Sequence, residues 1–295
     1  LFRQGVRGPE KKMNVYRSLE EIRGRLRRPV VTVGSYDGVH VGHRRLLETV
    51  KELAAGKEGE SVVVTFSPHP RQVLHPEDRS LRLLNSLPEK ILLLESVGID
   101  HLFVIPFTQA FSRLSSYDFT RDYLLEGVGA KTLIVGYNHH FGHNREGDFG
   151  YLERLRQKYG FELYEIPHYG VDAGKVSSTT VRKLIEAGDL VMAEKYLGAP
   201  YFVSGAWNSE TGELVSPEPA KLLPPDGRYS VEIRDAKDFL HAGKKERGVG
   251  AITVKGSKMI LSAAGNVSPE SGKDVLVRFR SVPQGISWAV PETGM

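Results

Sequence analysis

Two histidines, His40 and His43, stand three residues apart between two patterned stretches of the chain. The β-branched run before them, residues 30–33, predicts a buried strand, and the leucine spacing after them, residues 46–53, predicts an amphipathic helix. Three glycines punctuate the turn between these stretches: Gly34, Gly38 and Gly42. A strand that runs through a glycine turn into a helix start offers backbone N–H groups to an anion. With two imidazoles as further donors, this stretch predicts a nucleotide-phosphate site.

A second polar loop leaves the next strand-like run, residues 62–66. It reads Thr65-Phe66-Ser67-Pro68-His69-Pro70-Arg71. The two prolines restrict the backbone of this loop, and His69 and Arg71 carry side chains that can meet an anion or an aromatic ring. Taken alone, the loop is better explained as a rigid structural turn, so a functional interpretation depends on the other motifs.

A third loop, residues 136–148, follows a strand-like run and contains His139, His140 and His143. Imidazole is the commonest metal ligand in proteins, so three histidines suggest a metal site. Zinc, however, needs three or four ligands in fixed geometry, commonly with thiolate or carboxylate help. Adjacent histidines in a glycine-rich loop do not usually supply that arrangement. The sequence therefore predicts no protein metal site here.

A run of hydroxyl side chains opens a helix predicted at residues 179–187. Its members are Ser177, Ser178, Thr179 and Thr180. Hydroxyls at a helix start cap the unpaired N–H groups, and the helix dipole favours phosphate there. Arg182 adds a planar guanidinium that suits phosphate oxygens. An ordinary capping run followed by a surface arginine is the alternative explanation.

The string around the first histidine pair, G-x-Y-D-G-V-H-x-G-H, resembles the H-x-G-H signature of the nucleotidylyltransferase superfamily. Its neighbouring letters are similar to those of the bacterial-type FAD synthetases, the bifunctional riboflavin kinase/FMN adenylyltransferase family, which usually has Phe where this chain has Tyr36. The other three segments resemble further elements of that family, T-F-x-P-H-P-x, G-x-[DN]-F-x-F-G-x-x-R-x-G-D and I-S-S-T-x-[IV]-R. One departure is His139, where the family usually has an aromatic residue.

The resemblance implies transfer of AMP from ATP to FMN, with both nucleotides as substrates and Mg²⁺ bridging the phosphates. It implies catalytic roles for His40, His43 and Arg182. It implies ATP contacts from two segments: Gly34, Ser35, Tyr36, Asp37, Gly42, Ser177, Ser178, Thr179 and Thr180. It implies FMN contacts from the other two: Phe66, Pro68, His69, Pro70, Arg71, Asn138, Phe141, Arg145 and Asp148.

The elements that must position these residues alternate between strand and helix through the first two-thirds of the chain. This alternation is typical of a parallel sheet covered on both faces. Helices are predicted at residues 87–97, 149–159 and 190–197, and a further helix is predicted from a Ser115 or Ser116 cap through Leu125. We therefore expect an α/β, Rossmann-like domain over residues 13–200, with each motif just beyond a strand or at a helix start.

From Tyr201 onward, short alternating runs separated by glycine, proline and serine predict a second domain, residues 201–295, that is a small all-β barrel or sandwich. It resembles a flavokinase barrel in one string, Leu222-Leu223-Pro224-Pro225-Asp226-Gly227-Arg228-Tyr229. The family's P-T-A-N string, whose Thr and Asn hold magnesium and ATP, does not occur in the sequence. We therefore expect that riboflavin kinase activity is lost and that the barrel serves as scaffold, oligomer contact or flavin-delivery surface.

Several alternatives stay open beside this interpretation. One is a full bifunctional enzyme, and another is a non-catalytic regulator that binds flavin or nucleotide on the same fold. A nucleotidylyltransferase with another phosphate acceptor fits less well, because the second and third loops resemble the flavin branch. A class I aminoacyl-tRNA synthetase fits poorly, because the best candidate for its second signature is only Gly256-Ser257-Lys258-Met259.

Composition narrows the class of protein. The 295 residues are 40% hydrophobic and 26% charged, with no cysteine and a net charge of +4. The lack of cysteine excludes disulfides and thiolate metal sites and agrees with a cytoplasmic protein. No run approaches the ~20 apolar residues of a membrane span, and the modest charge does not argue for nucleic acid. We expect small-molecule substrates and neither a membrane nor a nucleic-acid partner. A homo-oligomer is possible. Residues 1–12 lack periodicity and are left out of the fold prediction.

Overall fold

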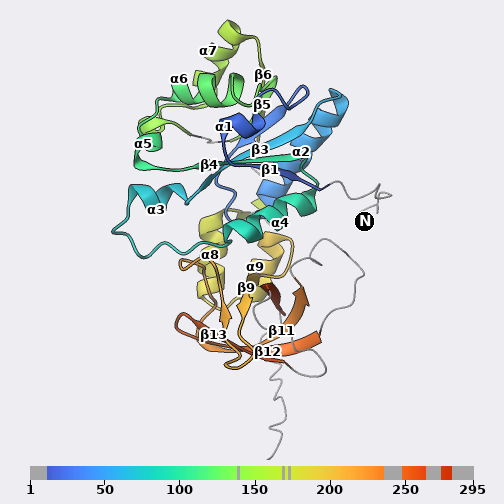
Figure 1. Ribbon diagram of the computed structural model, residues 1–295, viewed down its shortest axis with the longest axis vertical. Coiled ribbons are helices and arrows are strands. Elements are labelled where there is room, and N and C mark those ends of the chain that lie inside the picture. Colours follow the sequence, from blue (N-terminus) through green and yellow to red (C-terminus); the bar gives the residue numbers. More distant parts are fainter. Residues whose placement is uncertain are drawn as a thin grey trace, which may run out of the picture. The chain divides into compact units, whose positions relative to one another are not determined.

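The computed structural model describes residues 12–137, 140–167, 170–171, 174–235, 248–263 and 274–280. Asn138 and His139, two residues of the third loop, lie outside these ranges. The chain forms two compact units that divide between Val176 and Ser177 (Figure 1). The two units are defined by the density of contacts within each. The domain boundary expected at residue 200 concerns which segments fold together, and it stays a prediction.

The first unit is built on a six-stranded parallel sheet. From one edge to the other the strands are β1 (Asn14–Tyr16), β4 (His101–Pro106), β3 (Ser61–Ser67), β2 (Val30–Val33), β5 (Thr132–Gly136) and β6 (Glu162–Ile166). Each neighbouring pair is parallel. Runs of Val, Ile and Leu fill the central strands, as expected where helices cover both faces. The predicted α/β, Rossmann-like fold class is confirmed.

Helices connect these strands, and their ends follow ordinary capping chemistry. The longer ones are α2 (Val41–Gly56), α4 (Leu87–Val97) and α7 (Phe149–Tyr159), and the shorter ones are α1 (Leu19–Ile22), α3 (Pro70–Leu74) and α5 (Gln109–Ser112). Ser86 and Glu89 form a capping box at the start of α4, and Gly98 ends it in the left-handed conformation. The predicted bounds of α4 and α7 are confirmed. Among the described residues, no helix has the length and apolarity that a membrane crossing requires.

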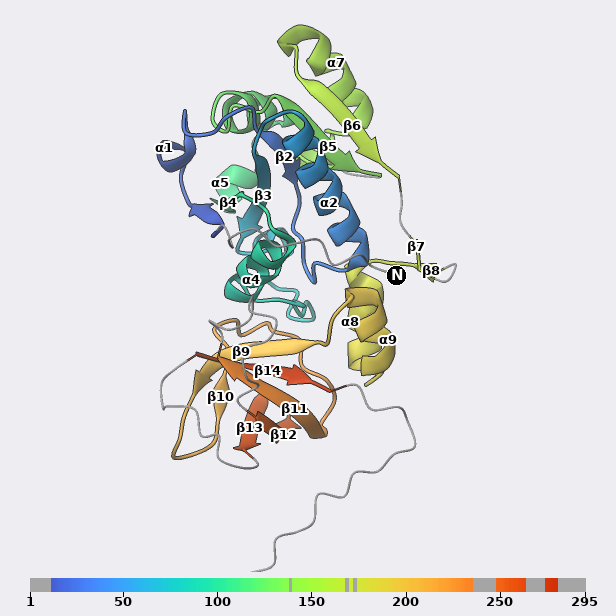
Figure 2. The same cartoon turned by 90° about the vertical axis from the view of Figure 1, so that its right-hand side faces the viewer.

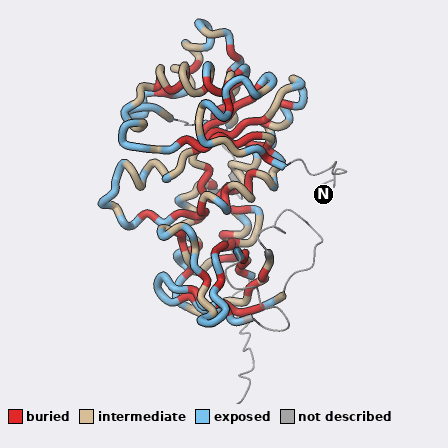
Figure 3. The backbone as a smooth tube through the Cα atoms, in the orientation of Figure 1, coloured by how far each residue is buried: buried red, intermediate tan, exposed pale blue. Residues whose placement is uncertain are grey.

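The two faces of the sheet are covered by different helices. Alternate strand residues such as Val31 and Val62 join one buried cluster, to which α1 and α7 contribute Ile22 and Leu152. Figure 2 shows α2 on the opposite side of the strands from α1. Buried positions follow the strands in both units (Figure 3). Helices therefore cover both faces of the sheet.

The helix predicted to end at Leu125 begins as expected but changes type. Ser115 caps α6 (Ser116–Asp118), which continues as the π-helix η1 (Phe119–Leu125). Its hydrogen bonds include two that span five residues, from Glu126 N–H to the Arg121 carbonyl and from Val128 N–H to the Tyr123 carbonyl. A π-helical stretch of this kind is uncommon, and the capping signals alone do not distinguish it from an α-helix.

The described residues of the second unit form two helices and an antiparallel sheet. The helices are α8 (Ser178–Glu186) and α9 (Leu190–Leu197). The strand order is β10 (Leu214–Val215), β9 (Phe202–Trp207), β14 (Asp274–Phe279), β11 (Gly227–Asp235), β12 (Gly248–Lys255) and β13 (Lys258–Ala263). A bridge between Glu213 and Ile260 joins the two outer strands, so the sheet closes almost completely. Of the two predicted architectures, barrel and sandwich, the structure shows the barrel.

Candidate active site

Three loops leave the sheet of the first unit at one edge. Because the strands are parallel, the carboxyl ends of β2, β3 and β5 lie at that edge. The chain moves from β2 outward to β3 and β4, and later returns to β5 on the other side of β2. Such a reversal is a topological switch point, where open α/β sheets bind ligands. The fold therefore brings three of the four predicted segments to one edge.

The turn between β2 and α2 has an unusual backbone. Tyr36, Gly38 and Val39 have φ angles of 47°, 91° and 40°. Glycine adopts positive φ freely, whereas a β-branched residue such as Val39 is strained there. Val39 is fully buried, so the surrounding packing can hold it in this conformation. Backbone strain of this kind clusters at ligand sites, which supports a functional role for this turn.

His40 and His43 meet at the first turn of α2. His40 is the N-cap, and its Nδ1 accepts a hydrogen bond from the backbone N–H of His43 at 3.2 Å. The two rings stack, with centroids 3.6 Å apart and planes inclined by 13°. The bond to Nδ1 places the proton of a neutral His40 ring on Nε2, from which it can be donated. The three-residue spacing thus produces a paired set of donors.

His43 is surrounded by protein on most sides, although its surface is not fully covered. Burial lowers its pKa well below the usual value, and the charges of His40 and Lys90 lower this pKa further. The ring is therefore neutral near pH 7 and donates one N–H. Its Nδ1 is buried without a hydrogen-bond partner among the described residues. Because such an atom costs stability, the turn is not arranged for stability alone.

Tyr36 packs beside the histidine pair. Its ring meets the ring of His43 edge-on at 5.2 Å, and its hydroxyl contacts Thr32 Oγ1 at 2.7 Å. Burial raises the pKa of this hydroxyl, so it stays protonated. A Cβ added to Gly34 would lie 3.0 Å from the Tyr36 ring, and one added to Gly42 would lie 3.3 Å from the His40 ring. These two glycines therefore leave room for the aromatic rings.

Asp37 ties this turn to the segment that precedes α4. Its carboxylate is buried and accepts hydrogen bonds from the backbone N–H groups of Leu84 at 3.2 Å and Asn85 at 3.1 Å. Nearby, Thr65 Oγ1 donates to the carbonyl of Ser35 and links the first loop to β3. A carboxylate repels phosphate, so these bonds give Asp37 a structural role. Its predicted ATP contact stays a prediction.

The second loop shows both of the expected features, stiffness and exposed polar groups. His69 caps α3, where Nδ1 accepts from the N–H of Arg71 at 3.2 Å, and Pro70 is the first helical residue. The exposed Arg71 pairs with Asp78 at 3.2 Å. Phe66, at the end of β3, lies 5.5 to 6.3 Å from three other phenylalanine rings: Phe107, Phe111 and Phe119. An aromatic cluster therefore stands beside the polar loop at the predicted FMN site.

The third loop is fixed at two places. Phe141 and Gly147 pair across it, and Ser116 Oγ donates to the Phe141 carbonyl at 3.1 Å. Asp148 caps α7 by accepting from the N–H of Tyr151 at 2.7 Å. Arg145 is exposed, with a φ of 59°. The predicted contact of Asn138 falls outside the described residues.

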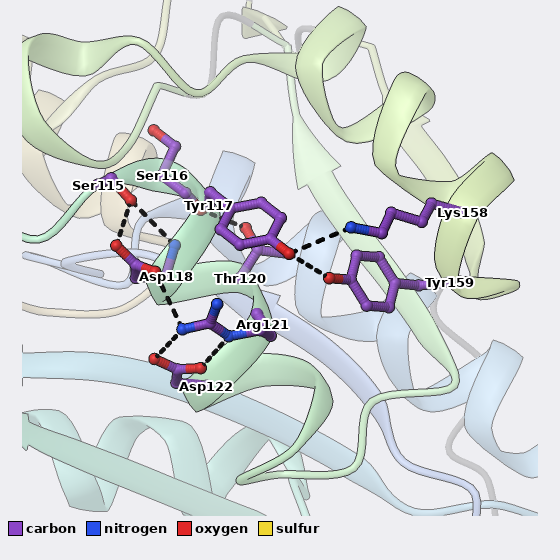
Figure 4. A network of polar contacts seen from close by, with 9 residues as sticks. All are labelled: Ser115, Ser116, Tyr117, Asp118, Thr120, Arg121, Asp122, Lys158 and Tyr159. Atoms are coloured by element: carbon purple, nitrogen blue, oxygen red, sulfur yellow. Dashed lines mark hydrogen bonds and ion pairs between the residues drawn. The ribbon is translucent and has the colours of Figure 1, made fainter.

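A polar network links α6 to α7, the helix that follows this loop (Figure 4). The hydroxyls of Tyr117 and Tyr159 are 2.7 Å apart, and Lys158 Nζ donates to Tyr117 at 3.2 Å. On the same segment, Arg121 pairs with Asp118 at 3.0 Å and with Asp122. The network joins α6, whose Ser116 contacts the third loop, to the end of α7, the helix that follows this loop.

The fourth predicted segment belongs to the second unit. Ser177 is the N-cap of α8, and its Oγ accepts from the N–H of Thr180 at 3.1 Å and contacts Thr180 Oγ1 at 2.9 Å. Thr179 is exposed and Arg182 is partly buried. The hydroxyl cap predicted from the sequence is present. Contact of this segment with the same ATP as His43 stays a prediction, because the two residues lie in different units.

Sequence reasoning did not single out three buried polar residues of the first unit: Thr32, Glu89 and Lys90. Glu89 and Lys90 lie on the buried face of α4 together with Leu93 and Leu94. Charged residues within an apolar helical stripe were the available signal, since such residues are seldom buried. No group of three His, Cys, Asp or Glu side chains that could hold a metal occurs within the described ranges.

Comparison with known proteins decides the family. Residues 23–180 match the FAD synthetase family, which is more than half of the chain. This chain belongs to the FAD synthetase family. The predicted family and enzyme class are thereby confirmed.

The relatives of this FAD synthetase-family chain include bacterial enzymes of two kinds. It is 32% identical over 212 residues to the bifunctional riboflavin kinase/FMN adenylyltransferase of Escherichia coli, covering 69% of this chain and 67% of that protein. It is 35% identical over 193 residues to the Pseudomonas fluorescens protein of the same name, covering 65% of this chain and 61% of that protein. It is 31% identical over 207 residues to the FAD synthetase of Listeria monocytogenes, covering 70% of this chain and 82% of that protein.

A solved structure has the same fold as this FAD synthetase-family chain. It is a Streptococcus pneumoniae protein described as a macrolide-efflux protein, with a TM-score of 0.74 and coverage of 94% of each chain. The two sequences are 22% identical. At that identity the likeness concerns the fold alone.

Proposed function

We propose that this FAD synthetase-family chain transfers AMP from ATP to FMN and releases FAD and pyrophosphate. One observation carries the proposal: the stacked His40–His43 pair lies at the first turn of α2, at the switch point of a parallel sheet. Such a position combines backbone N–H groups, a helix dipole and two ring donors. Family membership indicates ATP and FMN as the two substrates.

The reaction needs alignment of its substrates more than proton transfer. A phosphate oxygen of FMN attacks the α-phosphorus of ATP, and the new P–O bond forms as the bond to the β-phosphate oxygen breaks. The electron pair leaves with pyrophosphate. A phosphate monoester is already anionic near neutral pH, so no side chain has to remove a proton. The protein must hold two anions in line and stabilise the charge that builds on the phosphates.

The residues divide these tasks by position. His40 and the neutral His43 donate hydrogen bonds to the α- and β-phosphate oxygens. The hydroxyl-capped start of α8 and Arg182 hold the far end of the triphosphate. The loops after β3 and β5, with their aromatic cluster and exposed arginines, hold FMN. Support for these assignments comes from the motifs and from the common edge at which three of the loops lie.

Magnesium enters the proposal as a companion of ATP. The described residues contain no cluster of three possible metal ligands, and the Asp37 carboxylate already accepts two backbone N–H bonds. This donor set fits an ion that takes most of its ligands from phosphate and water. When bound, Mg²⁺ would neutralise part of the phosphate charge.

The barrel is proposed to lack riboflavin kinase activity. The P-T-A-N string that serves the kinase in the family does not occur in the sequence. The barrel itself is retained as a nearly closed antiparallel sheet. Because the barrel fold is kept while the P-T-A-N motif is absent, we propose that the barrel serves as a scaffold or contact surface.

Both proposals are tested with the purified chain. Incubation with FMN, ATP and Mg²⁺, followed by chromatography, should show FAD and an equal amount of pyrophosphate. A parallel incubation with riboflavin in place of FMN should show no FMN. Absence of FAD in the first reaction would reject the transferase and leave the flavin-binding regulator. Formation of FMN in the second would show that the chain is bifunctional despite its altered barrel.

A further inference from the structure

Helices α2 and α4 are tied together at two levels. Just before the helices begin, Asp37 accepts the N–H groups of Leu84 and Asn85. Farther along, Nζ of Lys51 in α2 donates to the carbonyl of Val97, the last residue of α4. The two helices therefore run in the same direction with their starts together. This arrangement decides which residues of α4 face the histidine pair.

Lys90 is the residue of α4 that this register places across from His43. Lys90 follows the Leu84–Asn85 tie by about as many residues as His43 follows Asp37. Lys90 is 5% exposed. The positive charge of Lys90 is also close enough to help lower the pKa of His43. The register of the two helices and this effect on the pKa together place a buried ammonium near the imidazole.

A buried lysine at this place calls for a reason. Placing an ammonium group inside a protein is costly unless charged or polar groups surround it. The His43 ring is close enough for Lys90 to affect its pKa. Two buried carboxylates lie on the same packed elements: Glu89 is next to Lys90 in α4, and Asp37 binds the segment just before α4. Leu93 and Leu94 continue the same buried face, so an apolar residue at position 90 would pack equally well by pattern. The charge itself is therefore the feature to explain.

We propose that Lys90 is a positioning residue of the adenylyl-transfer site, whose buried ammonium supplies a fixed positive charge that the neutral His43 ring lacks. The proposal rests on the proposed function and deepens it. The neutral His43 ring donates a hydrogen bond but does not balance the charge of a triphosphate. A cation behind this ring adds positive charge and, together with burial, keeps the ring in its neutral form, so that its N–H remains a donor. Lys90 acts through His43 and through its field, without a direct bond to the substrate.

The experiment compares Lys90→Met with Lys51→Met. Both variants remove one lysine charge between α2 and α4, but Lys51 lies eight residues beyond His43, or ~12 Å along the helix. The pKa of His43 is read from its ring proton by NMR without substrate, with the signal assigned by its loss in His43→Gln. We expect Lys90→Met to raise this pKa toward the ordinary value and Lys51→Met to leave it unchanged.

Kinetics give the second measurement. The KM for ATP in FAD formation should rise about tenfold in Lys90→Met, as expected for loss of one nearby charge. Lys90→Arg should restore most of the affinity, and Lys51→Met should leave the KM unchanged. If Lys90→Met does not fold, Lys90→Gln repeats both measurements with a side chain that still forms hydrogen bonds.

The outcomes separate this inference from the proposed function. An unchanged His43 pKa in Lys90→Met, or a KM change that Lys51→Met reproduces, would overturn the role of Lys90 even if the wild type makes FAD. A wild type that makes no FAD would reject the transferase, while the shifted His43 pKa would still support the electrostatic link. If Lys90→Met raises the pKa of His43 and Lys90→Arg restores most of the affinity for ATP, the results support both the role of Lys90 and the proposed function.

Discussion

The two segments predicted to hold the triphosphate are both helix starts, but they are built differently. At α2 the cap is the His40 ring, which stacks on His43 beside the strained, fully buried Val39. At α8 the cap is the Ser177 hydroxyl, and no residue of the described stretch 176–182 has a positive φ angle. Thr179 of that segment is exposed.

The difference shows how far geometry alone can indicate a site. A serine cap stabilises a helix wherever it occurs, so the start of α8 would look the same without a ligand. The start of α2 combines a strained residue with a buried ring nitrogen that has no partner within the described residues. These features oppose stability, and a ligand site is the usual reason for them. The predictions below test this contrast in order of expected effect.

Removing the His43 ring should have the largest effect. We expect His43→Ala to lower kcat about 100- to 1,000-fold, the usual cost of one donor to a developing charge. The measurement is FAD formation, with circular dichroism to confirm the fold. The matched control is His75→Ala. His75 is an exposed residue at the end of α3, so this variant should keep wild-type turnover. Wild-type activity in His43→Ala would remove the assigned role.

Breaking the tie at Asp37 should destabilise the first unit. In Asp37→Asn the two N–H groups of Leu84 and Asn85 lose a charged acceptor, which should cost about 1–3 kcal/mol of the free energy of unfolding. Urea denaturation measures this loss. Glu48→Gln, an exposed carboxylate on α2, should change stability little. Equal effects in the two variants would contradict the structural role given to Asp37.

Two caps in the second unit allow a direct comparison at α8. Ser177 caps α8 and Asp189 caps α9, each by accepting a backbone N–H. Replacing either by alanine should cost about 1 kcal/mol of stability. Only Ser177→Ala should also raise the KM for ATP, because only α8 is proposed to meet phosphate. If both variants, or neither, change the KM, the start of α8 has only a structural role.

The smallest expected effect concerns the pH dependence of stability. Burial of His43 should make the free energy of unfolding fall at acidic pH. The pKa of His43 in the folded protein lies well below the ordinary value, which is ~6.5 for the unfolded chain. Between these two values the unfolded chain binds more protons, so the free energy of unfolding should fall as the pH drops below about 6.5. His43→Asn removes this contribution. Urea titrations at about pH 7.5 and pH 5.5 should show a smaller pH dependence in the variant, and equal dependence would contradict the assigned burial.

Elements with strong local signals could be predicted to the residue. Helix α4 has Ser86 with Glu89 at its start and Gly98 at its end, and helix α7 has Asp148 and Gly160. The short edge strand β1 was not predicted, because three residues carry little pattern and its pairing with β4 is nonlocal. The π-helical form of η1 was also not predicted, because its local sequence signals are those of an ordinary α-helix.

In the candidate site, too, features that depend on local sequence could be predicted, whereas features that depend on distant contacts could not. Local spacing indicated the His40–His43 pair and the Ser177 cap, since each involves residues within one helical turn. The role of Asp37 could not be read in this way, because its partner Leu84 lies 47 residues away. The burial of Lys90 likewise depends on the packing of α4 against α2.

The central claim is that one ATP is held by the imidazole pair and by the start of α8. A crystal structure with a non-hydrolysable ATP analogue, in which a methylene group replaces the α,β-bridging oxygen, tests it most directly. We predict a single nucleotide whose α- and β-phosphates lie within hydrogen-bond distance of His40 and His43, with its far end at Ser177 and Arg182. A nucleotide bound away from the imidazole pair, or one that reaches only one of the two helix starts, would contradict the account.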